Sequence, residues 1–348
     1  MQLTARQLSE LELHDDATLA LNPLDGEQFS VFGKINIDLS ESVDVSFTID
    51  LQDWEGQWVL TSEEGMSYFP TMVSTDSSLG DDEGSRHRFS GSLSFGDGLG
   101  FFDTGAVSLF WQETDQMQIT RRQKTAFSMG PMGPPTALLE YRDYQFNQTI
   151  SGIAANFFKQ TNFLGKQNNI IYGFEFESSE ASRPRTRYEE NLMMGNRETF
   201  LGGEFFPSKT FPDTEIERTA MFLNNVIDFS PRTSVVFGIR YDGYQLTPKS
   251  DALYEINAPS GNELLYIDDS NVSLKLGVIR DFSDNLSVFA QYAEGFRSPD
   301  YESANLSFLN QAYRYAVESP PGLDSETSEG FEVGFRGLVD NFSWLFSL

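Results

Sequence analysis

The chain has 348 residues, with 24 Lys or Arg against 52 Asp or Glu, so its formal net charge is −28 at pH 7. This acidity argues against binding to nucleic-acid phosphates, whose affinity depends on basic residues. Cysteine is absent and histidine occurs only twice, so we exclude a disulfide framework, a thiolate nucleophile and a cysteine-based metal site.

Neither end of the sequence carries a recognisable targeting segment. Residues 1–16 lack a basic start followed by an apolar run, and no stretch approaches the roughly 18 apolar residues of a membrane-spanning helix. Residues 341–348 stop inside an apolar run, where an interrupted strand would leave an open ladder of N–H and C=O groups. We therefore expect the sequence to be a fragment of a longer chain.

Period-two alternation of apolar and polar residues dominates the chain. The first clear case runs from Val43 to Leu51, where Val, Phe, Ile and Leu alternate with Asp, Ser and Thr. The same pattern recurs at 89–95, 235–241 and 331–335. A two-residue period places all apolar side chains on one face of a strand, and β-branched and aromatic residues fill these positions. The fold class is therefore predicted to be all-β.

Twelve strands are predicted from this pattern. Several are longer than ordinary sandwich strands and suit tilted membrane strands of about 9–11 residues or more. In chain order they cover about residues 28–40, 43–53, 86–96, 103–120, 144–160, 167–179, 214–229, 232–246, 271–282, 285–296, 327–338 and 341–348.

Short turns and long loops alternate between these strands. The turns include 40–42, 230–232 and 283–285, whereas the loops are polar and contain Gly and Pro. A compact soluble domain rarely carries five structureless loops of over about 20 residues, but outer-membrane barrels have short periplasmic turns and long extracellular loops. The alternation predicts an antiparallel transmembrane β-barrel. The five loops cover about 54–85, 121–143, 180–213, 247–270 and 297–326.

Aromatic residues near the strand ends agree with membrane placement. Tyr241, Tyr292 and Phe296 suit an interfacial girdle, although a sandwich core would explain them too. The first 27 residues contain no predicted strand, and the twelfth strand is cut short. We therefore expect a slice of a larger cylinder instead of a closed twelve-stranded barrel.

Three segments carry a family resemblance. Residues 213–248 contain GIRYD, residues 271–308 lead into FRSP, and residues 319–337 read SPPGLDSETSEGFEVGFRG. In order and spacing they resemble the barrel of TonB-dependent outer-membrane receptors, most closely the heme/hemoglobin receptor branch. The matching positions, which we expect to be structural, are Gly238, Arg240, Tyr241, Asp242, Phe296, Arg297, Pro299, Pro321, Leu323, Glu326, Glu332, Gly334 and Arg336.

The resemblance implies a 22-stranded barrel with an N-terminal plug. Residues 1–348 would then form one partial barrel domain of about twelve strands without the plug, with the strongest resemblance over 213–337. It further implies the outer membrane of a Gram-negative cell once a signal peptide is supplied, contact with outer-membrane lipid, and coupling to the TonB complex through the missing plug. The cargo would be an iron-containing small molecule or a heme protein, with heme or a ferric siderophore as transported ligand and no intrinsic cofactor.

Candidate ligand-binding residues follow from this interpretation. Tyr313 and Tyr315 lie in the loop between the two boxes, where the heme branch places a ligating histidine, and phenolate can ligate heme iron. His87 is expected at the end of the first long loop. The alternative for all three is an ordinary surface or girdle role.

Two basic clusters stand out in so acidic a chain. Arg183, Arg185 and Arg187 alternate in the loop 180–213, and a second cluster of Arg121, Arg122 and Lys124 opens the loop before it. They could bind propionates, an anionic chelate or lipopolysaccharide phosphates. The alternative is a rim that balances charge locally.

No catalytic constellation is predicted, and we expect no enzyme activity. Neither histidine lies in a recognisable triad context, and the G-x-S-x-G elbow is absent from the sequence. No metal-ligating set is predicted either. Two alternatives stay open: a soluble or secreted all-β binding or adhesion protein, and a passive porin.

Overall fold

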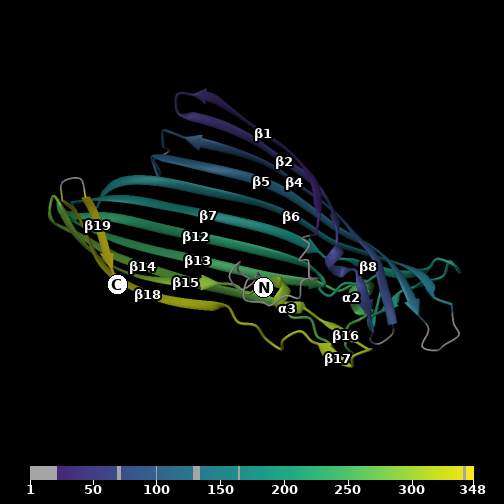
Figure 1. The fold of residues 1–348 in the computed structure, drawn as a ribbon. Helices are drawn as coiled ribbons and strands as arrows, with labels where there is room; N and C mark the ends of the chain where they lie inside the picture. Colours follow the sequence, from purple (N-terminus) through teal and green to yellow (C-terminus); the bar gives the residue numbers. More distant parts are fainter. Residues whose placement is uncertain (1–21, 69–71, 99, 128–133, 164, 340–341) are drawn as a thin grey trace.

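A computed structural model describes residues 22–348, apart from 69–71, 99, 128–133, 164 and 340–341. Within them, twelve long strands form one continuous antiparallel sheet in which each strand pairs with its neighbours in chain order (Figure 1). These strands are β1 (Leu24–Ser40), β2 (Val43–Val59), β4 (Met72–Phe95), β5 (Thr104–Phe127), β6 (Thr136–Phe163), β7 (Lys166–Ser182), β12 (Asp213–Ser230), β13 (Thr233–Lys249), β14 (Ile267–Ser283), β15 (Leu286–Arg297), β18 (Glu326–Val339) and β19 (Phe342–Ser347).

Shorter elements occupy the long connections. Among them, β8 pairs with the upper part of β6, and β3 pairs with β4. These elements are η1 (Thr61–Glu63), β3 (Gly65–Ser67), β8 (Arg185–Asn191), β9 (Arg197–Glu198), β10 (Phe200–Leu201), β11 (Glu204–Phe205), α2 (Ala252–Glu255), α3 (Tyr301–Asn305), β16 (Phe308–Asn310) and β17 (Tyr315–Val317).

The two ends of the sheet differ as the sequence predicts. Tight turns join β1 to β2, β12 to β13 and β14 to β15 at one end. The long connections with β8, α2, α3 and the β16–β17 hairpin gather at the other end, on the right of Figure 1. All twelve predicted strands are present, and the all-β prediction is confirmed.

Several predicted boundaries are wrong at the loop end. β1 begins at Leu24, inside the 27 residues expected to lack a strand, and β4 begins at Met72, so His87 lies within a strand and not at the end of a loop. Arg121, Arg122 and Lys124 likewise lie within β5. The loops 180–213 and 297–326 contain short strands and helix α3. Above the apolar part of the wall both faces of a strand are polar, so the alternation that marks a strand disappears there.

Cross-strand register divides the side chains into two faces. The apolar members of each strand lie opposite apolar members of the next, as in the pairs Ile49–Phe89 and Met221–Tyr241. Because opposed residues point to the same side, they form one continuous apolar band across the sheet. Its members include Val45, Phe47, Ile49, Phe89, Leu93, Leu109, Trp111, Phe174, Met221, Leu223, Ile239, Tyr241, Val272, Leu276, Tyr292, Phe331, Val333 and Phe335.

The opposite face is polar and carries the packed loops. Ile216, Tyr244, Leu246 and Ile267 project from it and form a buried cluster with Ala304 of α3. We call this polar face the inner face and the apolar one the outward face. In the part of the chain that the structure describes, no helix has the length and apolarity that crossing a membrane requires.

Candidate functional site

An inner-face hollow of about 450 Å³ brings two of the sequence motifs together. GIRYD contributes Arg240 and Asp242 from β13, and FRSP contributes Phe296 and Arg297 from the end of β15. Strand pairing places Phe296 two strands away from β13, and the inward alternation of β13 turns Arg240 and Asp242 toward the same space. We call this space the inner hollow.

Ion pairs fix the arginines of the inner hollow. Arg240 donates through Nε to Asp242 Oδ1 at 2.8 Å and through a terminal nitrogen to Glu175 Oε2 at 3.2 Å. Arg218 donates to Glu177 Oε1 at 2.9 Å, and its guanidinium lies 5.6 Å from the ring centroid of Tyr244. The guanidinium groups are thus already paired with carboxylates on the same wall.

Tyr244 closes the inner hollow on the loop side. Its residue surface is only 2% exposed, and its hydroxyl has no hydrogen-bond partner among the described residues. An unsatisfied buried hydroxyl is costly in a folded protein, so this group is suited to a partner that arrives with a ligand.

Three long loops interlock above the inner hollow, and no pattern in the sequence predicts this. The side chain of Asn257 accepts from Phe205 N and donates to Phe205 O, both at 2.8 Å. Asn305 does the same with Leu265, at 2.8 and 2.9 Å. Each of these buried asparagines therefore joins two different loops as a strand pair would. We call residues 199–211, 250–266 and 298–325 together the cap.

Further bonds hold the cap segments to one another and to the wall. Asn310 Nδ2 donates to Gly202 O at 2.8 Å. Lys209 is 5% exposed, and its Nζ lies 2.7 Å from Asp213 Oδ1 and 2.6 Å from Asp251 Oδ2. Burial lowers the pKa of Lys209, but the hydrogen bonds to these two carboxylates outweigh that effect, so the pKa is raised. Asp251 also caps α2, so one lysine anchors two connections.

The three predicted arginines of loop 180–213 are each engaged within the protein. Arg183 pairs with Glu302 of α3 at 2.5 Å, and its guanidinium lies over the rings of Phe146, Phe211 and Tyr301 at 4.7, 5.7 and 5.4 Å. The other two are paired as well. Arg185 donates to Glu204 at 2.7 Å, and Arg187 donates to Glu140 at 2.8 Å.

The charge cluster around Glu140 was missed at the sequence level. Its side chain is fully buried and pairs with Lys124, with Arg142 at 2.7 Å and with Arg187. Glu140 lies eleven residues above Ser151, the level at which the outward apolar band begins in β6. Burial raises the pKa of Glu140, but the hydrogen bond from Lys124 and the surrounding cationic charges lower it to about 2. This carboxylate fixes β8 on β6.

The remaining predicted ligand residues are spread apart. Tyr313 and Tyr315 belong to the exposed β16–β17 hairpin, where Tyr315 packs against Phe308 at a centroid distance of 5.8 Å. His87 projects from the outward face, opposite Leu51, and its Nε2 lies 3.2 Å from Asp53 Oδ1. The structure therefore brings none of the three to the inner hollow.

The motif positions divide between the two faces. Tyr241 points outward, whereas Glu332 points inward and accepts from Gln291 at 2.5 Å. A Cβ at Gly334 would lie 2.6 Å from the Phe346 carbonyl oxygen, so only glycine fits there. Leu323 packs on the buried cluster beneath α3. Arg297 and Glu326 form an ion pair at 3.6 Å. Of the other motif residues, Gly238 and Arg336 lie on the strands of the wall, and Pro299 and Pro321 lie in the cap.

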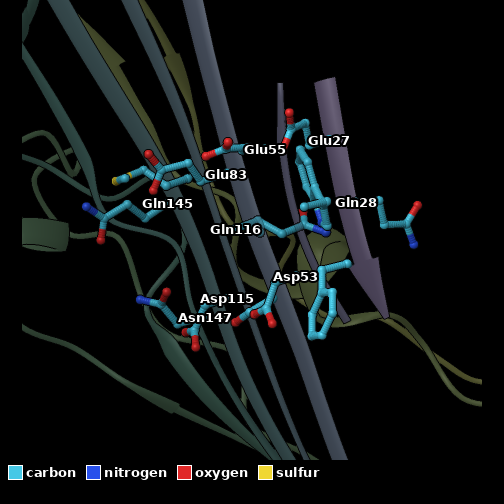
Figure 2. A pocket seen from close by; sticks show the side chains of 14 residues that line it. Glu27, Gln28, Asp53, Glu55, Glu83, Asp115, Gln116, Gln145 and Asn147 are labelled. Carbon is cyan, nitrogen blue, oxygen red and sulfur yellow. The ribbon is translucent and has the colours of Figure 1, made fainter. Parts of the chain in front are cut away.

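A second hollow of about 710 Å³ lies on the outward face, above the apolar band (Figure 2). Figure 2 shows the carboxylates of Glu55 and Glu83 on one side of it, and these two residues oppose each other across β2 and β4. Asp53 and Asp115 also line it, and among its described lining residues none is Lys or Arg. We call it the outer acidic hollow.

A family model described as TonB dependent receptor-like, beta-barrel, matches residues 32–348. No curated protein matches the chain. Among solved structures, copper transporter OprC is similar at 14% identity and a TM-score of 0.60, over 93% of this chain and 45% of that one.

Two further solved structures resemble the chain. The Serratia marcescens hemophore receptor HasR, in complex with hemophore HasA and heme, has 12% identity and a TM-score of 0.42, over 91% of this chain and 51% of that one. BauA, the ferric preacinetobactin receptor from Acinetobacter baumannii, has 11% identity and a TM-score of 0.39, over 94% and 52%. The chain therefore spans about half the length of these structures.

Proposed function

The chain belongs to the TonB-dependent receptor β-barrel family. We therefore propose that it forms part of the wall, and the cap described above, of an outer-membrane receptor that takes up an iron-containing cargo. The cargo classes we propose are a ferric siderophore and heme. Receptors of this family are transporters, so the chemistry of the chain would be binding and passage without a covalent step. Its location would be the outer membrane of a Gram-negative cell.

The observation that carries this proposal is the contrast between the two faces of one sheet. The outward band is apolar on strand after strand, from Phe47 on β2 to Phe335 on β18. The inner face at the same height carries serines and charged residues, including Ser108 and Arg240. Apolar-out and polar-in is the pattern of a membrane barrel whose outward surface meets lipid.

The alternative of a soluble or secreted adhesion protein is not favoured. Such a protein would pack a second layer on its apolar face, as the two sheets of a sandwich do. In the described part of the chain the loops pack on the polar face, and Ile35, Leu109 and Phe331 remain 63%, 58% and 71% exposed on the other side.

Cargo contact is proposed at the inner hollow beneath the cap. Its walls combine aromatic side chains with charged ones, and the interlocked loops lie directly above it. A plug connected to TonB would complete the passage, and both are proposed partners of the whole receptor. Outer-membrane lipid would contact the outward band.

Membrane fractionation together with a binding assay tests the proposed function. We expect the protein in the outer-membrane fraction, extractable only with detergent, and we expect quenching of tryptophan fluorescence when a ferric siderophore or hemin is added. Recovery in the soluble fraction as a monodisperse protein without detergent would refute the membrane role. Membrane recovery without quenching by any iron complex would refute the cargo class alone.

A further inference from the structure

The negative charge of the chain is concentrated at the loop end. The strand tops and loops, residues 24–28, 52–88, 112–150, 177–220, 242–271 and 294–330, contain 36 Asp or Glu and 15 Lys or Arg. Their net charge is −21, against −7 for the rest of the chain. The outer acidic hollow is one part of this field, and the cap is another.

The cations in these segments are almost all neutralised by their neighbours. Among the described residues, 13 of the 15 Lys and Arg side chains lie within 4.0 Å of a carboxylate. The other two are Arg88, whose guanidinium stacks on Phe110 at 4.7 Å, and Arg314 in the β16–β17 hairpin. Carboxylates without such partners remain on the exposed cap, among them Glu263, Glu318 and Asp324.

Those three acids lie on cap segments that are connected to one another and to the buried cluster beside the inner hollow. Asn262, next to Glu263, accepts a hydrogen bond from the backbone N–H of Ser319, next to Glu318, so these two cap segments are joined. Asp324 follows Leu323, which packs against the cluster that contains Tyr244. The cap that carries these acids therefore packs on the cluster that contains Tyr244, whose hydroxyl has no partner among the described residues. Arg218 and Arg240, which line the same hollow, are already paired.

From these observations we infer that the cargo is a cationic metal complex, held in the inner hollow with the Tyr244 hydroxyl as a hydrogen-bond partner. The inference rests on the proposed function and narrows its cargo class. An anionic chelate would approach against the field of the cap and would find its arginines already engaged. A cation is attracted by the same field, because summed surface charge raises the local concentration and the association rate of an oppositely charged ligand.

The experiment compares two iron complexes on the receptor purified from outer membranes in detergent. One probe is a ferric trihydroxamate with a pendant ammonium group, singly positive, and the other is a ferric tris-catecholate, triply negative. Association rates are measured by stopped-flow tryptophan quenching. At about 10 mM salt, where the Debye length is about 30 Å, we expect the cationic complex to associate at least about tenfold faster. At about 1 M salt the rates should converge.

Two sets of variants identify the source of the preference. Glu263→Gln, Glu318→Gln and Asp324→Asn together should slow the cationic complex about threefold at low salt. The matched control, Asp38→Asn, Glu41→Gln and Asp97→Asn, removes the same charge at the turn end and should change nothing. Tyr244→Phe should weaken binding of the cationic complex about two- to tenfold at either salt concentration.

The outcomes separate the inference from the proposed function. Faster or tighter binding of the anionic complex by a receptor that folds normally overturns the inference and leaves the receptor role intact. The same holds if the control triple variant slows association as much as the cap triple variant. Absence of binding by both complexes at every salt concentration overturns the ferric-siderophore cargo and the inference together, while recovery of the protein in the outer membrane still supports the receptor role.

Discussion

An arginine on the outward band should destabilise the protein in a bilayer, whereas the same residue one position earlier should not. Leu109 of β5 points outward between Gly91 and Ile153, and it is 58% exposed, so more than half of its side chain is left for lipid to cover. Ser108 points inward, opposite Ser92 and Ala154, where small side chains leave room. The pair Leu109→Arg and Ser108→Arg therefore tests the assignment of the two faces.

The magnitude follows from the position in the band. A cationic side chain at the middle of a lipid-facing barrel strand costs about 2–4 kcal/mol. Losing the lipid contact of the leucine adds about 1 kcal/mol, since about half of the burial energy of a leucine side chain is removed. We expect Leu109→Arg to lower the free energy of unfolding by about 3–5 kcal/mol, and Ser108→Arg by under about 1 kcal/mol.

The measurement is urea unfolding in phosphatidylcholine vesicles, followed by tryptophan fluorescence and compared at equal protein-to-lipid ratio. Equal stability of Leu109→Arg and the unmodified protein would refute the assignment of the outward face. Equal loss in both variants would show that position along β5, and not the face, decides the cost.

Three further predictions concern the part above the band. Glu140 has a pKa of about 2 in the folded protein, against an ordinary value of 4.5, so its ionised form contributes about 3 kcal/mol to the free energy of unfolding. This contribution should be complete above about pH 4.5 and should be lost as the pH falls toward 2. Urea unfolding midpoints measured between pH 6 and 3 should therefore fall more in the native protein than in Glu140→Gln. Asn305→Ala leaves the N–H and C=O of Leu265 without partners, which costs about 1–3 kcal/mol of stability for each group. Residues 298–325 should then be cleaved faster by protease than in the unmodified protein, whereas Asn271→Ala should leave the cleavage rate unchanged. Gly203 has a φ of +90°, and a Cβ added there would lie 2.6 Å from Ala312 N. Gly203→Ala should therefore raise the rate of amide hydrogen exchange in the β16–β17 hairpin. An unchanged rate would contradict the close approach of Gly203 to Ala312.

The wall was predictable from sequence because its pattern is local. From Val43 to Leu51 apolar and polar side chains alternate along one strand. This two-residue period arises because one face of the strand meets lipid and the other meets a polar interior. The same reasoning failed above the band. Around Asp81, Asp82 and Glu83 both faces meet water and the alternation vanishes, so the sequence predicts a loop up to residue 85 where β4 already runs from Met72.

The site was predictable only in part. Arg240, Asp242 and Phe296 line the inner hollow, although the sequence predicts a structural role for these motif positions and ligand contact at other residues. The cap was not predicted, because Asn257 and Asn305 act through single hydrogen bonds to the backbone of distant loops and leave no periodic trace. Glu140 was overlooked for the same reason, since its cationic partners come from β5, β6 and β8.

The unequal length of the strands gives the opening a slope. β6 has 28 residues and β15 has 12, which at about 3.3 Å per residue is a difference of about 50 Å along the strand. The rim is therefore high over β4, β5 and β6 and low over β15 and β18. The cap segments 250–266 and 298–325 follow β13 and β15, so loops stand on the low side where extended strands raise the other side.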